Sequence, residues 1–234
     1  MTSREMQISF VTELTNNGDF ITRSKDSGSS PMPGSDIIFY WINRAIDKFI
    51  KTRYSGLNIK GESFEQSQKR TNDLRTIVTE STISTSSAST IKPNAYQATL
   101  PVDYFLTVGE EVDIQFTKNT VLTTVREGVK QTTSDRYRED IDNPLSSHIL
   151  HYYEARPLRM YQGSIVLLIS DGNYTIPTYY LRYIKNPITV TSIVACDLPL
   201  QTHYEIVKLA VGMYLENTLS DRYSTYSNEI NTME

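Results

Sequence analysis

The sequence has little cysteine, tryptophan and histidine. Of 234 residues, one is Cys, one is Trp and three are His. A single thiol, Cys196, excludes an internal disulfide and any zinc site built from several cysteines. It ends the apolar run in TSIVACDLP, so we expect a buried and unreactive thiol.

Long hydrophobic runs and an excess of basic charge are also missing. No stretch approaches the ~20 apolar residues of a membrane span, and the start MTSREMQISFVTEL lacks the apolar core of a signal peptide. We therefore expect no membrane partner and a chain made in cytoplasm-like conditions. A net charge of -4 and a pI near 5.5 argue against a surface that grips nucleic acid throughout.

The usual catalytic signatures are absent as well. There is no glycine-rich phosphate loop, Walker lysine, H-E-x-x-H or G-x-S-x-G motif. We predict a protein that is not an enzyme, with no catalytic residues, no metal and no cofactor. His203 lies in the first turn of a predicted helix, where packing or capping is favoured over catalysis.

One acidic segment supports an alternative function, a metal-dependent hydrolase. Residues 135–154, DRYREDIDNPLSSHILHYYE, combine oxygen and imidazole ligands suited to a divalent metal. The candidate ligands are Asp135, Glu139, Asp140, Asp142, His148, His151 and Glu154. The carboxylates lack the D-x-D-x-D-G order of a calcium loop, so a solvated acidic loop is favoured.

Basic residues on two predicted helices support a third hypothesis, an accessory module that binds DNA or the host. Arg44, Lys48 and Lys51 lie on or beside the polar face of one helix, as is normal for an amphipathic helix. In QKRTNDLR, Lys69, Arg70 and Arg75 alternate with Asp73, which favours ion pairing over a DNA track. DNA binding would show as an affinity that falls steeply with salt.

Two helical segments are clear. In SDIIFYWINRAIDKFIKTRYSG, apolar residues recur at i, i+3 and i+4 from Ile38 to Ile50, with Ser35 or Asp36 as a cap. DLPLQTHYEIVKLAVGMYLENTLSDRYS predicts a C-terminal helix, in which Thr202 and Glu205 form a capping box. A further helix is expected to open at Ser63.

The 16 tyrosines are concentrated in the strand-like middle of the chain. Tyrosine suits partly hydrated interfaces between subunits. An equally good explanation is a β-protein that is simply rich in tyrosine. In SIVLLISDGNYTIPTYYLRYIK, Asp171-Gly172 between apolar runs predicts a hairpin over 164–185. Pro177 in the returning strand indicates an edge strand or a bulge.

Helices, then strands, then a helix indicate an α+β fold: an N-terminal helical pair and a C-terminal helix form a small bundle beside an antiparallel β-region. The expected domains are a flexible arm over 1–34, rich in Ser, Gly and Pro towards its end; an α+β domain over 35–219; and a polar tail over 220–234. Residues 111–147 form a charged excursion, and residues 81–95 form a loop or a ragged edge strand.

Several segments together resemble a known family. They are IFYWINRAIDKFIKTRY with FEQSQKRTNDLRTIV, then TLPVDYF, and the ending DLPLQTHYEIVKLAVGMYLE. The sequence is similar to small structural proteins of crAss-like tailed bacteriophages, which form rings in the head-to-tail connector below the portal. More loosely, the chain looks like the head-tail adaptor proteins of podophages.

The resemblance implies a twelve-fold ring in the virion, stacked with the portal and neighbouring connector or tail proteins and assembled in the bacterial host. DNA would pass through its channel during packaging and ejection without being held by sequence. The expected partner-binding residues are Asp171, Gly172, Asn173, Tyr174, Tyr179, Tyr180, Tyr223 and Tyr226. The expected core contacts between the two long helices involve Trp41, Ile42, Phe49, Ile206, Leu209, Ala210 and Met213.

Overall fold

Helices come from the two ends of the chain and strands from its middle. The computed structural model describes residues 1–16, 33–55 and 64–217. The chain divides into a helical unit, residues 1–77 with 187–234, and a β unit, residues 78–186. This segregation confirms the predicted α+β class.

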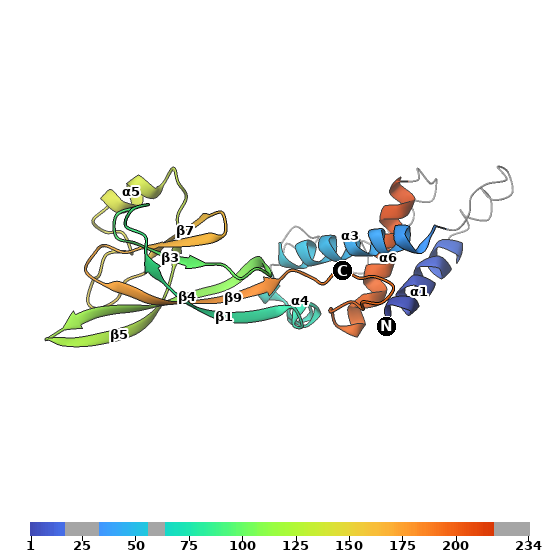
Figure 1. Ribbon diagram of the computed structural model, residues 1–234, viewed down its shortest axis with the longest axis horizontal. Coiled ribbons are helices and arrows are strands. Elements are labelled where there is room, and N and C mark those ends of the chain that lie inside the picture. Colours follow the sequence, from blue (N-terminus) through green and yellow to red (C-terminus); the bar gives the residue numbers. More distant parts are fainter. Residues whose placement is uncertain (17–32, 56–63, 218–234) are drawn as a thin grey trace. The chain divides into compact units, whose positions relative to one another are not determined.

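Three helices build the core of the helical unit. They are α1 (Ser3–Asn16), α3 (Ser35–Tyr54) and α6 (His203–Asn217), accompanied by the short α4 (Gln68–Leu74) and two 3-10 turns, η1 (Phe64–Gln66) and η2 (Leu200–Thr202). Both α1 and α3 pack against α6 (Figure 1). Tyr214 of α6 meets the rings of Phe10 and Trp41 edge-on, with centroids 6.0 and 6.4 Å away.

The apolar stripe of α3 faces this core. Its seven apolar residues from Ile38 to Ile50 that recur at helical spacing are buried. Among the residues expected in the core, the buried ones are Trp41, Ile42, Phe49, Ile206 and Ala210, and the partly buried ones are Leu209 and Met213. The segment after the β unit is tied to α3 by Asn43, which donates to the Val190 carbonyl and accepts from its amide.

Helix α1 corrects the expected flexible arm. Met6, Phe10 and Leu14 are buried, and their spacing of four places them on one face of the helix. This stripe is narrow, and Ile8 and Val11 lie outside it, which hides the amphipathic character of the helix in the sequence. Residues 17–32 of the expected arm, and the expected tail over 220–234, lie outside the described residues.

Two sheets form the β unit, and all but one of their strand pairs are antiparallel. The four-stranded sheet has the order β1-β9-β4-β5, with β1 (Val78–Ser84), β9 (Thr175–Lys185), β4 (Tyr104–Lys118) and β5 (Val121–Gly128). The five-stranded sheet has the order β2-β3-β8-β7-β6, with β2 (Ser86–Ser87), β3 (Ala95–Thr99), β8 (Ile165–Ile169), β7 (Leu158–Gln162) and β6 (Lys130–Gln131). Strand β6 runs parallel to β7.

The sheets pack face to face as a sandwich. Val112, Ile114 and Leu181 of the four-stranded sheet share a buried cluster with Val166 and Leu168 of the other sheet. The opposite face of the five-stranded sheet carries a second cluster, which Tyr137 and Ile141 of α5 (Tyr137–Asp142) cover. The outer face of the four-stranded sheet is polar.

The predicted hairpin over 164–185 is wrong. Strand β8 pairs with β3 and β7, whereas β9 pairs with β1 and β4, so Asp171-Gly172 turns the chain from one sheet to the other. The run IVLLI of β8 has apolar side chains on both faces of the strand, and each face packs in one of the two clusters. Burial of both faces requires a central strand. Its hairpin partner is β7, through a turn at Gly163 with φ of 61°.

Pro177 does not mark an edge, since β9 is a central strand. It lies where the β4–β9 register shifts between Asp113 and Gln115, which is the bulge that the sequence offered as the other reading. Its carbonyl accepts a hydrogen bond from the Thr85 amide at 3.0 Å. The missing amide of proline is therefore accommodated by an irregularity in the ladder.

Two further predictions are corrected. The charged excursion over 111–147 is ordered: it contains the end of β4, all of β5 and β6, and α5. A continuous helix was expected from Ser63, which lies outside the described residues. From Phe64 to Leu74 the chain forms only the short helices η1 and α4, and Val78 already belongs to β1. The Ser/Thr-rich segment that follows supplies the rest of β1, an edge strand as one reading expected.

Candidate subunit-interaction site

The four-stranded sheet ends in two long edge strands. Within the described part of the chain, β1 and β5 each pair with one neighbour only, and their other edges carry no strand. They contain seven and eight residues, whereas the edge strands of the other sheet contain two each. Unpaired backbone amides and carbonyls along such edges are ready to hydrogen-bond another chain.

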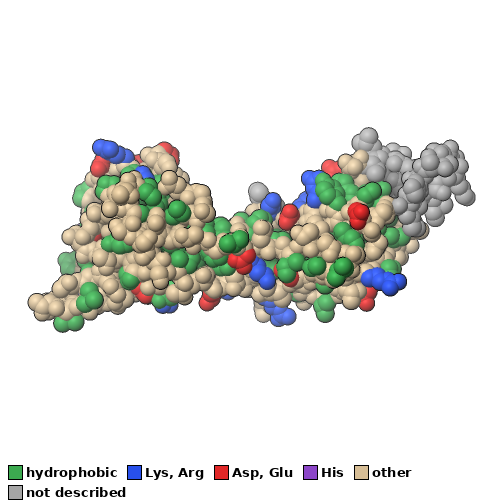
Figure 2. Space-filling model, in the orientation of Figure 1, with side chains coloured by type: hydrophobic (Ala, Val, Ile, Leu, Met, Phe, Trp, Pro, Cys, Tyr) green, Lys and Arg blue, Asp and Glu red, His purple; other side chains and the backbone are tan. Residues whose placement is uncertain are grey.

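The β4–β5 hairpin extends past the strands beside it (Figure 1). Its turn, Asn119-Thr120, has φ of 48° and 68°, the signs of a primed two-residue turn. Val121 and Leu122 next to the turn are 64% and 66% exposed, and Figure 2 shows hydrophobic side chains at this tip. The tip thus offers apolar surface beside an open edge.

A second turn displays an aromatic ring. The bridge at 151–154 closes two residues, Tyr152 and Tyr153, with φ of 49° and 77°. Positive φ costs a bulky residue about 1–2 kcal/mol. Tyr153 stacks on Phe116 at 5.6 Å, beneath the Lys118 ammonium, but Tyr152 is 97% exposed.

We expect Tyr152→Asn to raise the free energy of unfolding of the β unit by about 1 kcal/mol, because asparagine tolerates the left-handed conformation better. Urea titration followed by far-UV circular dichroism measures the change. The matched control is Tyr204→Asn, at an exposed position in α6, which should leave stability unchanged or slightly lower. An equal effect at both positions would contradict the strain at Tyr152.

Asp171 organises its own turn. One carboxylate oxygen accepts from the Asn173 amide at 2.8 Å, and the other accepts from the Leu150 amide at 2.9 Å. Gly172 has φ of 91°, and a Cβ there would lie 3.0 Å from the Asn94 side chain. These contacts give Asp171 a structural role.

The tyrosines predicted to bind partners fall into three groups. Tyr174 and Tyr179 are buried within the β unit, so the prediction is wrong for them: their hydroxyls donate to the His148 carbonyl and to Glu110. Tyr180 lies on the outer face, where its hydroxyl donates to Asp113 at 2.8 Å. Tyr223 and Tyr226 lie outside the described residues.

A buried charge cluster joins the two sheets. Arg159 of β7 pairs with Glu110 of β4 at 3.1 Å, and the two side chains are 9% and 7% exposed. Tyr161 and Tyr179 both donate to Glu110, and burial raises the pKa of each phenol, so both remain donors at neutral pH. Tyrosine hydroxyls here satisfy an interior carboxylate.

Comparison with known protein families identifies one family. Residues 38–225 match the family described as phage tail ring protein 3/4. The chain belongs to this family. The match spans most of the chain and confirms the resemblance to ring proteins of crAss-like phages, although no curated protein matches the chain. Phage tail ring proteins are structural parts of the virion that associate into rings, which favours a structural role over an enzymatic one.

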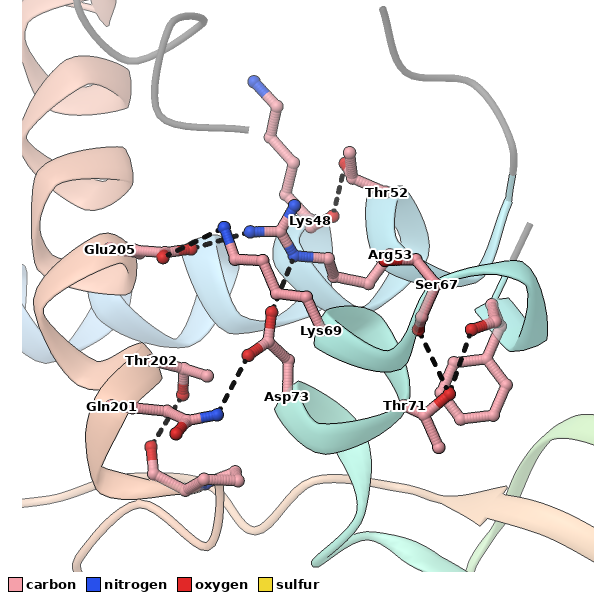
Figure 3. A network of polar contacts seen from close by, with 12 residues as sticks. Lys48, Thr52, Arg53, Ser67, Lys69, Thr71, Asp73, Gln201, Thr202 and Glu205 are labelled. Carbon is pink, nitrogen blue, oxygen red and sulfur yellow. Dashed lines mark hydrogen bonds and ion pairs between the residues drawn. The ribbon is translucent and has the colours of Figure 1, made fainter. Parts of the chain in front are cut away.

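The helical unit of this ring protein contains a polar network between α3, α4 and α6 (Figure 3). Arg53 Nε lies 3.3 Å from Asp73, and an Arg53 terminal nitrogen lies 2.7 Å from Glu205. Gln201 donates to the second Asp73 oxygen at 3.2 Å, and Lys69 approaches Glu205 at 3.7 Å. Burial raises the pKa of Asp73, and Arg53 opposes that rise.

The acidic segment does not assemble a metal site within the described residues, where no group of three potential ligands is close enough to hold an ion. Asp140 binds Lys130 and Thr132, which holds the pKa of that carboxyl below its usual value. His148 is buried, 2.9 Å from the Ser146 hydroxyl, and burial lowers its pKa. Asp140 and His148 are thus engaged in separate local contacts.

The basic helix faces are also engaged in local contacts. The Arg44 guanidinium lies over the Trp41 ring at 5.6 Å, and Arg70 is buried. Asp73 pairs with Arg53 of α3 at 3.3 Å. Among the described helices, none is both long and apolar enough to cross a membrane.

Proposed function

We propose that this chain is a head-to-tail connector protein, which forms a closed ring of identical copies below the portal and encloses the DNA channel. The observation that carries the proposal is the match of residues 38–225 to the phage tail ring protein family. The two long edge strands and the exposed hairpin tip support it, since they are surfaces that identical neighbours can cover.

The ring would contain twelve copies and stack on the portal and on neighbouring connector or tail proteins, after assembly in the bacterial cytoplasm. Residues 35–219 would supply the ring body, with the terminal segments contacting adjacent rings. A net charge of -4 suits a wall that lets DNA slide during packaging and ejection, because it offers few sites for phosphate binding.

Native mass spectrometry with electron microscopy of the purified chain, alone and with portal protein, tests the proposal. We expect one closed oligomer and a complex with portal. Binding to duplex DNA should be weak and should change little between 50 and 200 mM salt, because counterion release by a DNA-gripping surface would give a steep salt dependence. A salt-sensitive, high-affinity DNA complex would favour the accessory DNA-binding alternative.

A further inference from the structure

The edges of the four-stranded sheet lack two of the devices by which soluble proteins block edge pairing, proline and lysine. Neither β1, VTESTIS, nor β5, VLTTVREG, contains proline or lysine, and five successive residues of β5, 121–125, are uncharged. Both strands are rich in β-branched residues, which favour pairing. Ile83 and Val125 at the two edges are only partly buried against the core, and a further strand would cover them.

The two edges also have complementary direction. All neighbours in the order β1-β9-β4-β5 are antiparallel, so β5 runs opposite to β1. A ring repeats one contact between two different surfaces, with every copy in the same orientation along the ring. In that arrangement β5 of one copy meets β1 of the next as an antiparallel pair, so the same ladder can continue from copy to copy.

Side-chain alternation restricts the register of this joint. The exposed, outer-face residues are Glu80, Thr82 and Ser84 on β1 and Leu122, Thr124 and Arg126 on β5. A register that keeps outer faces together and pairs all seven residues of β1 places Val78 opposite Gly128 and Ser84 opposite Leu122. It also places Glu80 opposite Arg126, an oppositely charged pair.

This register shifts the sheet of one copy along the strands relative to the sheet of the next, and the size of that stagger agrees with closed sheets. Within one copy, Thr82, Tyr180, Glu111 and Gly128 lie in one row across the sheet. In the joint, Gly128 faces Val78 of the next copy instead of Thr82, a stagger of four residues over four strands. That is roughly 13 Å along the strands for roughly 19 Å across them, a tilt of about 35°, and closed barrels have tilts of 35–45°.

We propose that β5 of each copy pairs with β1 of the next, with Thr124 opposite Thr82 and Arg126 opposite Glu80, so that the four-stranded sheets join into one continuous sheet around the ring. This inference rests on the proposed ring. It names the second copy as the occupant of both edges and assigns the contact between them.

Engineered disulfides test the joint. In a Cys196→Ala background, the double variant Thr82→Cys with Thr124→Cys places thiols on directly opposed residues, whose Cβ atoms lie about 4.5–5.5 Å apart. Mild oxidation of the assembled protein should give a ladder of covalent multimers on a non-reducing gel, ending at the ring's full copy number. The matched control, Ser84→Cys with Thr124→Cys, sets the thiols on a diagonal about 7–8 Å apart and should cross-link at least tenfold less.

The outcomes separate this inference from the proposed function. Rings that form without cross-linking of the opposed pair would overturn the joint but not the ring, whereas a parent protein that forms no oligomer would overturn the ring itself. Dimers from the single variant Thr124→Cys would show β5 pairing with β5 in a two-fold contact, which would also overturn the joint.

Discussion

Arg53→Ala is expected to lower the free energy of unfolding of the helical unit by about 3–5 kcal/mol, because it leaves the buried carboxylate of Asp73 without its cation. Arg53 also binds Glu205, so α3, α4 and α6 lose a common contact. The single Trp, Trp41, lies in this unit, and its fluorescence during urea unfolding reports the change directly.

The loss should depend on pH. The pKa of Asp73 is raised above its ordinary value of 3.8, and without Arg53 it rises further. A group whose pKa is raised on folding favours the folded state at low pH and opposes it as pH rises through the folded pKa. The defect of Arg53→Ala should therefore be larger at pH 7.5 than at pH 5.

Lys69→Ala is the matched control for this network. Lys69 is half-exposed and 3.7 Å from Glu205, so its removal should cost less than about 1 kcal/mol. Equal losses from Lys69→Ala and Arg53→Ala, or a loss from Arg53→Ala that does not vary with pH, would contradict the assigned burial of Asp73.

Arg159→Ala is expected to destabilise the β unit by about 3–5 kcal/mol, because it leaves the buried carboxylate of Glu110 without this cation between the two sheets. Near-UV circular dichroism, dominated in this unit by tyrosine, should show unfolding at lower urea. If the ring is built from joined sheets, the variant should also assemble poorly at temperatures where the parent protein forms rings.

The control in the same unit is Arg138→Ala. Its pair with Asp142 in α5 is exposed, at 90% and 69%, and should contribute less than about 0.5 kcal/mol. A similar loss from both substitutions would show that the Glu110 pair is not specially costly to break.

Helical periodicity was the reliable signal in this sequence. It predicts α3, because one buried face fixes the spacing of apolar residues. The C-terminal helix begins at His203, but the predicted capping box is wrong: the Thr202 hydroxyl donates to the Pro199 carbonyl, and Glu205 pairs with Arg53. Helix α1 was missed because its buried stripe, Met6, Phe10 and Leu14, contains only three residues, and Ile8 and Val11 lie outside it. Such a stripe becomes stable only by packing on α6, which local sequence does not encode.

Local sequence did not predict which strands pair. Asp171-Gly172 correctly indicates a turn, but the turn does not specify which strands pair on either side of it. The better signal was IVLLI, whose apolar residues on both faces require cover on both sides and therefore a central strand. This pattern distinguishes β8 from β9, in which buried and exposed side chains alternate as in a sheet with one buried face.

The tyrosines show why composition was a poor guide to contact residues. Their number suggests interfaces, but Tyr174 and Tyr179 are used inside the β unit, where each hydroxyl donates to an interior oxygen. Composition does not distinguish an interface from a polar interior. The open edges of β1 and β5 emerge only from the sheet order.

The most direct test of the central claim is the mass of the purified chain in solution. Native mass spectrometry at micromolar concentration should give a single closed oligomer, twelve copies by the proposed ring, with a central hole in electron micrographs. A chain that stays monomeric at every concentration, both alone and mixed with portal protein, would contradict the claim that it builds a connector ring.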